Sequence, residues 1–374
     1  MSKKNLEALP FSLEMEEISI NGYERVLRVE EKRVNLSAII SLHNLTLGPA
    51  LGGIRIQPYK SFEAALEDAL RLSQGMTYKS SVAGVGFGGG KSVIIADPKT
   101  QKTPELLLAF GTAVHALEGA YICAEDVGCS MADVDIIRRA TPYVVGLSHE
   151  RASGNPSPFT AWGVFRGIQS VAFKLFGSES LTGKTIAIQG LGSVGSCLAD
   201  LLFWTGANLI IADVDREKTD LLAQRYGAKS VGADQIIQEK CDIFAPCALG
   251  GILNEQTIPT LRCQGIAGAA NNQLLQETDG DTLAKKKILY APDFVINAGG
   301  LLNVSAELEE GGYHPENPRK KTHQIYDTLL EIYAIAEKNR TSTQSAALEL
   351  ATHRLEHGIG KRIFSPTFHN AITD

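Results

Sequence analysis

The sequence predicts an α/β protein, with an N-terminal α/β domain built on a mixed sheet and then a domain with a doubly wound parallel sheet. Three observations favour this class. Residues 12–60 contain short runs in which apolar and polar residues alternate, which is typical of strands. Residues 148–158, SHERASGNPSP, are rich in Gly, Pro and Ser and mark the best domain boundary. Beyond residue 159, strand-like and helix-like segments alternate, as they do in parallel sheets joined by crossover helices.

The length of 374 residues is sufficient for two domains with a large core. Hydrophobic residues make up 44% of the chain and charged residues 21%, which is ordinary for a soluble globular enzyme. We expect the first domain at 1–150 and the second at 151–339, with a cleft between them. A C-terminal helix at about 340–374 is expected to pack back on the first domain.

Charge and composition exclude several classes of partner. The formal net charge is −6, whereas nucleic acid and anionic membranes require a basic surface, so we expect neither as a main partner. No apolar run approaches the roughly 20 residues of a membrane span. The first residues, MSKKNLEALPFSLEM, lack the apolar core of a signal peptide, so we expect a cytoplasmic protein. The six cysteines form no CxxC pair and are predicted to be reduced core thiols, with no metal site.

The first domain begins with strand-like segments. The clearest runs are residues 24–29 and 36–43, and the loop LGPALGGIR at 47–55 leads into another short strand. Ser61 is expected to cap a helix, because an apolar stripe at helical spacing follows it. That helix leads into residues 75–98.

Residues 75–98, GMTYKSSVAGVGFGGGKSVIIADP, hold Lys79 and Lys91 on either side of a glycine-rich run. The apolar residues after Lys91 predict a buried strand, and glycines before a strand allow the backbone to approach another group closely. A lysine held there would be poorly solvated. Desolvation disfavours an ammonium group and makes a lysine a usable base. The residues alone also allow a glycine-rich hairpin with two solvated lysines.

A carboxylate pair follows the next predicted strand. Residues 103–117 predict a helix, and the apolar run 121–124 then ends in Glu125 and Asp126. A carboxylate at the end of a strand, shortly before a glycine, often lies at a cleft. The alternative is that Asp126 only caps the helix predicted at 131–139.

The second domain opens with a long helix at 159–176 and then a strand at 184–189. The next residues, Gly190-Leu-Gly192-Ser193-Val194-Gly195, precede a helix at 196–205, and the following strand ends in Asp213. A GxGxxG turn in this context is a good dinucleotide fingerprint, because its glycines and the helix N-terminus accommodate a pyrophosphate. Asp213 would accept hydrogen bonds from the ribose hydroxyls and repel a 2′-phosphate, which favours NAD over NADP.

The parallel pattern continues to the C-terminal region. Three strands are expected at 241–246, 265–272 and 288–292, each ending in Pro or Asn, as strand tips at a cleft often do. Two amphipathic helices are expected at 324–338 and 343–357, with a glycine closing the second.

Residues 85–98, with the pattern VxxGGGKxVxxxDP, resemble the active-site signature of the glutamate/leucine/phenylalanine/valine dehydrogenases at every specified position. The preceding Gly75-Met-Thr-Tyr-Lys79 is typical of the leucine and phenylalanine members. The resemblance runs from about residue 13 to about 360 and is closest to the leucine-specific members. It implies a catalytic domain followed by a Rossmann NAD-binding domain, and a homo-oligomer, probably an octamer on resemblance alone.

The resemblance also implies an activity and a set of site residues. The activity is reversible, NAD-dependent oxidative deamination of leucine, isoleucine and valine. Lys79 would bind the substrate carboxylate, Lys91 would be the general base, and Asp126 would shuttle a proton. Further substrate-binding positions are Leu51, Gly52, Met76, Ala124, Val145, Asn272, Leu301 and Val304. Cofactor-binding positions are Thr160, Gly190, Gly192, Ser193, Val194, Gly195, Asp213, Cys247, Ala248 and Asn271.

Three alternatives remain: an aromatic amino-acid dehydrogenase, a glutamate dehydrogenase and a non-catalytic NAD-binding sensor. Glutamate-specific relatives place a lysine at the position of Leu51 and a hydroxyl residue near that of Val304, so burying a second substrate carboxylate here would be costly. Ala124 leaves room in the pocket while Leu301 fills some of it, which favours aliphatic over aromatic substrates. The intact lysines and Asp126 argue against a sensor.

Overall fold

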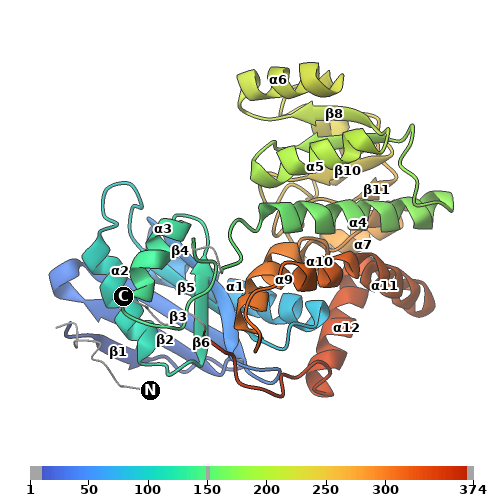
Figure 1. The fold of residues 1–374 in the computed structure, drawn as a ribbon. Helices are drawn as coiled ribbons and strands as arrows, with labels where there is room; N and C mark the ends of the chain where they lie inside the picture. The colour runs from blue at the N-terminus through green and yellow to red at the C-terminus, as the bar shows by residue number, and fades with distance from the viewer. Residues whose placement is uncertain (1–10, 149–151, 369–374) are drawn as a thin grey trace. The chain divides into compact units, whose positions relative to one another are not determined.

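The computed structural model describes residues 11–148 and 152–368, which divide into two compact units (Figure 1). The first unit holds the described residues up to Asn155, together with Val304–His314 and those from Arg354 onward; the second holds Pro156–Asn303 and Pro315–His353. Residues 149–151, at the predicted domain boundary, lie outside the described residues. The predicted class is confirmed, because a mixed sheet precedes a parallel one. The cleft expected between the units stays a prediction.

The first unit is built on a six-stranded sheet in the order β1-β2-β3-β5-β4-β6. The pairs from β1 to β5 are antiparallel, and β4 pairs in parallel with both β5 and β6. The sheet is therefore mixed, as predicted. Its strands are β1 (Glu14–Glu17), β2 (Arg25–Glu31), β3 (Leu36–Asn44), β4 (Ala50–Gln57), β5 (Gly88–Ile95) and β6 (Tyr121–Glu125).

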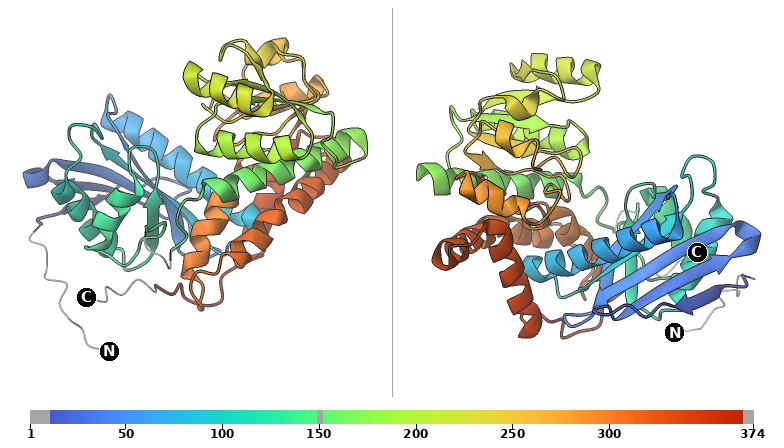
Figure 2. Two further views of the ribbon diagram at one scale, coloured as in Figure 1. Left: turned by 45° about the horizontal axis from the view of Figure 1, so that its top comes forward. Right: turned by 180° about the vertical axis from the view of Figure 1, so that it is seen from behind.

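Alternating side chains on these strands form two cores, one on each face of the sheet. Val26, Ile39 and Val93 pack beneath α1 (Phe62–Ala83) on one face. Their sequence neighbours turn to the other face and pack against α2 (Pro104–His115) and α3 (Met131–Arg138). Figure 2 shows α1 lying along the sheet. The Ser61 hydroxyl accepts a hydrogen bond from Ala64 N–H at 3.2 Å, which confirms the predicted cap of α1.

Three separate stretches of chain complete the first unit. The Glu307 carboxylate accepts a hydrogen bond from Gly146 N–H at 3.0 Å. Arg354 Nη1 donates to the carbonyl of Val82 at 2.8 Å. Arg362 N–H donates to the carbonyl of Leu47 at 2.8 Å, and its guanidinium lies 4.2 Å from the centre of the Phe87 ring. These late residues are thus part of the first unit's structure.

The second unit has a parallel six-stranded sheet in the order β12-β11-β10-β7-β8-β9. The chain starts in the middle at β7, runs outward through β8 and β9, and then returns to β10 on the other side of β7. This is the doubly wound Rossmann arrangement, in which ligands bind where the strand order reverses. The strands are β7 (Thr185–Gln189), β8 (Asn208–Ala212), β9 (Lys229–Ser230), β10 (Ile243–Pro246), β11 (Gly265–Ile266) and β12 (Leu289–Tyr290).

Helices flank this sheet and begin close to the predicted positions. The helix predicted at 196–205 begins three residues earlier, because Gly192 already occupies the N-cap. The strand predicted at 265–272 ends at Ile266, because only Gly265 and Ile266 pair with β10, opposite Ile243 and Phe244. The helices are α4 (Ser157–Phe176), α5 (Ser193–Trp204), α6 (Arg216–Tyr226), α7 (Asp279–Lys285), α8 (Asp293–Ile296), α9 (Gly299–Ser305), α10 (Glu316–His323), α11 (Ile325–Asn339) and α12 (Thr343–Glu356).

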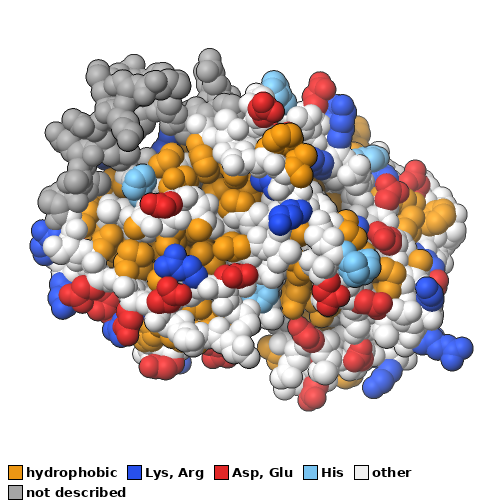
Figure 3. Space-filling view, turned by 90° about the horizontal axis from the view of Figure 1, so that it is seen from below, with side chains coloured by type: hydrophobic (Ala, Val, Ile, Leu, Met, Phe, Trp, Pro, Cys, Tyr) orange, Lys and Arg blue, Asp and Glu red, His pale blue; other side chains and the backbone are white. Residues whose placement is uncertain are grey.

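The surface carries charges of both signs. On the face drawn in Figure 3, acidic and basic side chains are interspersed, with hydrophobic side chains between them, and neither sign gathers into one patch. Within the described residues, no helix has both the length and the hydropathy needed to cross a bilayer.

Candidate active site

The two lysines of the glycine-rich stretch lie on a helix and a strand. Helix α1 continues through Gly75 to Ala83, so half-buried Lys79 is helical, and β5 begins at Gly88 and carries Lys91. The Lys91 side chain is only 6% exposed. The alternative of a glycine-rich hairpin with solvated lysines is therefore wrong. The prediction that the glycines precede the strand also needs correction, since three of them form its start.

Glycines in β5 and β4 allow their backbones to approach neighbouring elements closely. A Cβ atom on Gly89 would lie 2.1 Å from Thr77 Oγ1 and 2.2 Å from the Thr77 nitrogen, both in α1. A Cβ on Gly52 would lie 1.7 Å from the carbonyl oxygen of Gly90. Any larger residue would push α1 off β5, or β5 off β4. The glycine pattern thus brings the lysine-bearing helix and strand together.

Lys91 forms an ion pair with Asp126 immediately after β6. Its Nζ atom lies 2.9 Å from Asp126 Oδ2. Asp126 is not the cap of the next helix: Ser130 caps α3, in a capping box that Asp133 completes. The helix-capping interpretation of Asp126 is therefore wrong, and its carboxylate is directed instead at the lysine.

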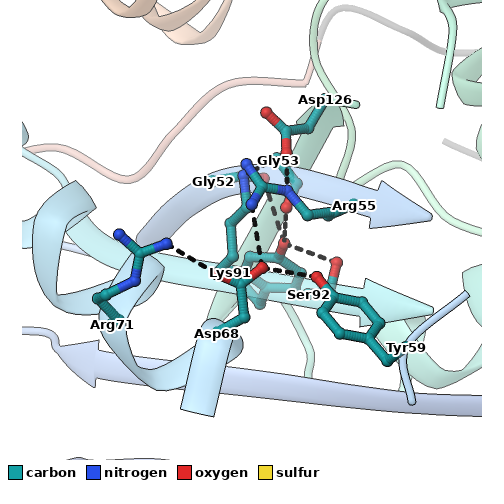
Figure 4. A network of polar contacts seen from close by, with 10 residues as sticks. Gly52, Gly53, Arg55, Tyr59, Asp68, Arg71, Lys91, Ser92 and Asp126 are labelled. Carbon is teal, nitrogen blue, oxygen red and sulfur yellow. Dashed lines mark hydrogen bonds and ion pairs between the residues drawn. The ribbon is translucent and has the colours of Figure 1, made fainter. Parts of the chain in front are cut away.

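Arg55 and Asp68 extend this pair into a larger network that the sequence analysis missed (Figure 4). Arg55 Nε donates to Asp126 Oδ2 at 3.0 Å, and its Nη1 donates to Asp68 Oδ2 at 3.0 Å. The sequence did contain a signal for this network: Arg55 stands between two isoleucines, Ile54 and Ile56, in a strand that is buried. A charge in such a run needs a partner.

These cations fix the protonation state of Asp126. Burial acts to raise the pKa of its carboxyl group, but the charges and hydrogen bonds of Lys91 and Arg55 outweigh burial and lower that pKa to about 2. Burial likewise opposes ionisation of Asp68, and hydrogen bonds from Tyr59, Arg71 and Arg55 lower its pKa below the usual range. Both carboxylates are therefore charged at neutral pH.

Gly53 leaves the space that the ion pair occupies. A Cβ atom there would lie 2.7 Å from the Asp126 Cβ and 3.1 Å from Lys91 Nζ. Behind it, the Tyr121 hydroxyl donates to the Gly52 carbonyl at 3.1 Å and lies 3.1 Å from the Ser92 hydroxyl. This buried contact ties β4, β5 and β6 together beneath the pair.

The structure distributes the predicted substrate residues over both units. The first unit contains Lys79 and six of the other predicted positions, of which Met76 is half-buried and the other five are buried. These six are Leu51, Gly52, Met76, Ala124, Val145 and Val304. The second unit contains Leu301, buried in α9, and Asn272, exposed in a loop with φ of 51°.

The glycine-rich turn of the second unit joins β7 to α5. Gly190 has φ of +94°, a conformation that favours glycine, and a Cβ on Gly195 would lie 2.0 Å from its carbonyl oxygen. Gly192 is the N-cap, and no side chain caps α5, which begins with Ser193 and Val194. The first N–H groups of α5 remain available to an anion, so the turn fits the pyrophosphate of a dinucleotide.

Asp213 lies directly after β8, beside this turn. Its Oδ2 accepts a hydrogen bond from Leu191 N–H at 2.5 Å, and its Oδ1 accepts one from Asp215 N–H at 3.0 Å. Burial opposes ionisation, yet these N–H groups lower the pKa of Asp213 below the usual range. Asp213 is therefore a charged group that also holds the glycine-rich turn.

The remaining predicted cofactor residues surround the same end of the parallel sheet. Ala248 follows β10, and a Cβ on Gly190 would lie 2.7 Å from its Cβ. Cys247 N–H donates to the carbonyl of Gln189 at 2.7 Å. Asn271 Oδ1 accepts a hydrogen bond from Asn297 at 2.6 Å. Thr160 lies instead on α4, where a Cβ on Gly300 would come within 2.9 Å of its hydroxyl.

Two family models match this chain. Residues 23–143 match the dimerisation domain of the Glu/Leu/Phe/Val dehydrogenases, and residues 210–358 match the Glutamate/Leucine/Phenylalanine/Valine dehydrogenase model. Together these matches span well over half of the chain.

Several relatives are similar over nearly their whole length. A leucine dehydrogenase from Geobacillus stearothermophilus is 50% identical over 89% of this chain and 91% of its own. A phenylalanine dehydrogenase from Caldalkalibacillus thermarum is 46% identical over 90% and 92%. The crystal structure of L-tryptophan dehydrogenase from Nostoc punctiforme superposes with a TM-score of 0.79 and 46% identity, covering 90% of this chain and 97% of that one. The chain therefore belongs to the glutamate/leucine/phenylalanine/valine dehydrogenase family of amino-acid dehydrogenases.

Proposed function

We propose that this enzyme catalyses the reversible, NAD-dependent oxidative deamination of leucine, isoleucine and valine to 2-oxo acids and ammonia. The observation that carries the proposal is the ion pair of buried Lys91 with half-buried Asp126, at 2.9 Å, in a sheet that also carries apolar Leu51 and Ala124. Similarity to a leucine dehydrogenase at 50% identity supports it. A charged pair in apolar surroundings suits a substrate with one polar end and an aliphatic side chain.

Three charged residues of the first unit, Lys79, Lys91 and Asp126, have roles in this reaction. Lys79 binds the substrate carboxylate through a charge-assisted contact. Lys91 takes a proton from the water that attacks the imine carbon. Asp126 accepts the hydrogen bond of Lys91 Nζ and passes protons to and from the amino group together with that lysine. Because Lys91 contributes most to keeping Asp126 ionised, the two groups exchange protons as a coupled pair.

The second unit holds the cofactor. NAD+ supplies the hydride acceptor when it is bound. Gly190, Gly192, Gly195 and the first N–H groups of α5 hold its pyrophosphate, and Asp213 accepts hydrogen bonds from its ribose hydroxyls. The charge on Asp213 disfavours a 2′-phosphate, so we propose NAD rather than NADP. Cys247, Ala248 and Asn271 border the nicotinamide end.

A second candidate function is deamination of aromatic amino acids. The phenylalanine and tryptophan dehydrogenases named above, each at 46% identity, favour it. The small side chain of Ala124 in the first unit would leave room for a ring. Aliphatic and aromatic substrates share Lys79, Lys91 and Asp126, so only the apolar positions decide between them.

A substrate screen tests the proposal. Formation of NADH is followed with NAD+ and each L-amino acid, and kcat/KM is compared. We expect leucine, isoleucine and valine to react within roughly 10–200-fold of one another, since one methylene discriminates no better in an apolar pocket. Glutamate should be slower by orders of magnitude, because its second carboxylate would be buried without a partner. A higher kcat/KM for phenylalanine would establish the second candidate instead.

We also propose a cytoplasmic homo-oligomer, an octamer by family resemblance. The match of residues 23–143 to a dimerisation domain supports self-association. All six cysteines are free thiols, which suits a reducing compartment.

A further inference from the structure

Two cations share one oxygen of Asp126. Lys91 Nζ lies 2.9 Å and Arg55 Nε 3.0 Å from Asp126 Oδ2. The Arg55 side chain is 17% exposed, so the contact is largely shielded from solvent. Its guanidinium therefore contributes a permanent positive charge next to the pair, because arginine does not lose its proton in proteins.

The Nη1 end of the Arg55 guanidinium is held by Asp68 of helix α1. Its Nη1 donates to Asp68 Oδ2 at 3.0 Å, and the Tyr59 hydroxyl donates to the same oxygen at 2.6 Å. Arg71 Nη2 donates to Asp68 Oδ1 at 2.9 Å. Arg71, Asp68, Arg55 and Asp126 form a chain of alternating charge (Figure 4). The guanidinium is thus fixed at both ends, which a lysine could not reproduce.

We propose that Arg55 is a positioning residue for the deamination. It directs the carboxylate of Asp126 at Lys91, and it keeps Asp126 ionised while Lys91 gains and loses its proton. This inference rests on the proposed function. When Lys91 is neutral, Asp126 loses that positive partner. Arg55 then remains as the counter-charge, so Asp126 does not retain the proton that it must pass on.

The other groups around Asp126 do not supply this charge. Glu125 precedes it on β6, and burial followed by the charge of Asp126 raises the pKa of Glu125. Burial also raises the pKa of Cys129, to about 12, and that of Tyr121 well above its usual value. These neighbours are neutral or acidic. Among the described residues of the first unit, the cations that form ion pairs with Asp126 are Lys91 and Arg55.

Arg55→Met tests the proposal, with Arg71→Met as its matched control. Both variants remove an arginine that pairs with Asp68, but the Arg71 side chain is 54% exposed and forms no other ion pair with the described residues. We expect Arg55→Met to lower kcat for leucine by about 10- to 100-fold, the range of one charged hydrogen bond, with NAD+ affinity retained. Arg71→Met should stay within about twofold of the wild type. Equal losses in the two variants would overturn the proposal.

The pH profile separates positioning from a purely structural tie between β4 and α1. Loss of a fixed positive charge raises the proton affinity of the whole cluster, so the acid limb of the kcat profile should move to higher pH in Arg55→Met. Arg55→Lys keeps the charge and should retain most of the wild-type limb, although kcat recovers only in part. An Arg55→Met enzyme that is slow but has an unmoved acid limb would mean that Arg55 is only structural.

A double-mutant cycle asks whether Arg55 acts through Asp126. In an Asp126→Asn background, Arg55→Met should lower kcat by less than about threefold, because no carboxylate remains to be positioned. Losses that multiply across the two sites would contradict the proposal.

Acid unfolding keeps the inference testable if no amino acid is oxidised and the proposed function fails. The pKa of Asp126 is about 2, below its ordinary value of 3.8. Its ionisation therefore contributes stability that is complete above the ordinary value and lost as the pH falls toward 2. In Arg55→Met the pKa of Asp126 should lie closer to its ordinary value, so this contribution should be smaller and should be completely lost at a higher pH than in the wild type. The difference should vanish in the Asp126→Asn background. If Arg55→Met does not fold, Arg55→Gln, which also removes the charge, is compared in its place. Coincident acid-unfolding curves would refute the action of Arg55 on Asp126.

Discussion

Lys91 and Lys79 should respond differently to removal, because one is assigned to chemistry and the other to binding. Lys91→Ala should lower kcat by about 10²- to 10⁴-fold, the usual contribution of a general base, while NAD+ binding persists. Asp126 would keep Arg55 as a partner, so the fold should survive. Lys79→Ala should mainly raise KM for leucine, by roughly 10- to 100-fold, through loss of one charged contact. Steady-state kinetics and NAD+ titration check both. Turnover by Lys91→Ala within tenfold of wild type would remove that lysine from the mechanism.

Asp213 should control the choice of cofactor. Asp213→Ser removes the charge that faces a 2′-phosphate, and a serine oxygen can still accept from Leu191 N–H. The ratio of kcat/KM with NADP to that with NAD should rise about tenfold or more, equivalent to at least 1.4 kcal/mol. Asp215→Ser is the control, since Asp215 caps α6 through Lys218 N–H and serine caps equally well. A wild-type enzyme that uses both cofactors equally would contradict the assignment.

Glycines allow the elements of the first unit to pack closely. Replacing Gly53, which lies in a close contact, can be compared with replacing Gly75, which does not. Gly53→Ala on β4 should lower kcat by at least about tenfold, because the new Cβ would overlap Asp126 and shift Lys91. Gly75→Ala on α1 is the control: apart from its chain neighbours and the helix backbone, no described atom lies within 4 Å of a Cβ there, and alanine should stabilise the helix by about 0.5–1 kcal/mol. Denaturant unfolding and kinetics measure both. Full activity in Gly53→Ala would mean that the end of β6 can move away from the new Cβ without loss of catalysis.

The elements also indicate what the sequence could predict. Ser61, the glycine-rich turn after β7 and the acid after β8 are local patterns with local causes, and each lies where it was expected. The length of α1 was missed, because a glycine inside a helix costs only about 1 kcal/mol and packing against β5 compensates for it. The Arg55–Asp68 pair could not be predicted, since its residues meet only when β4 and α1 pack.

At the scale of the whole molecule, the proposed assembly is the property to measure. Light scattering at micromolar concentration should give a mass several times the 40.2 kDa of one chain, with eight copies as the expected number. The reason is the match of residues 23–143 to a dimerisation domain, together with family resemblance. We expect the contacts at the N-terminal strands and the C-terminal helices. A particle of about 40 kDa would disprove self-association.

The division of the first unit among three stretches of chain has a consequence for synthesis on the ribosome. Its sheet is translated early, but Arg354 and Arg362, which bond to Val82 and Leu47, emerge only near the end. A nascent chain therefore carries an unfinished first unit while most of the second unit is being made. Closing loops of this length is slow compared with forming local helices. The second unit is complete once His353 has been translated, whereas the first unit needs residues beyond it. We therefore expect the second unit to finish folding before the first, the reverse of the order in which they are translated.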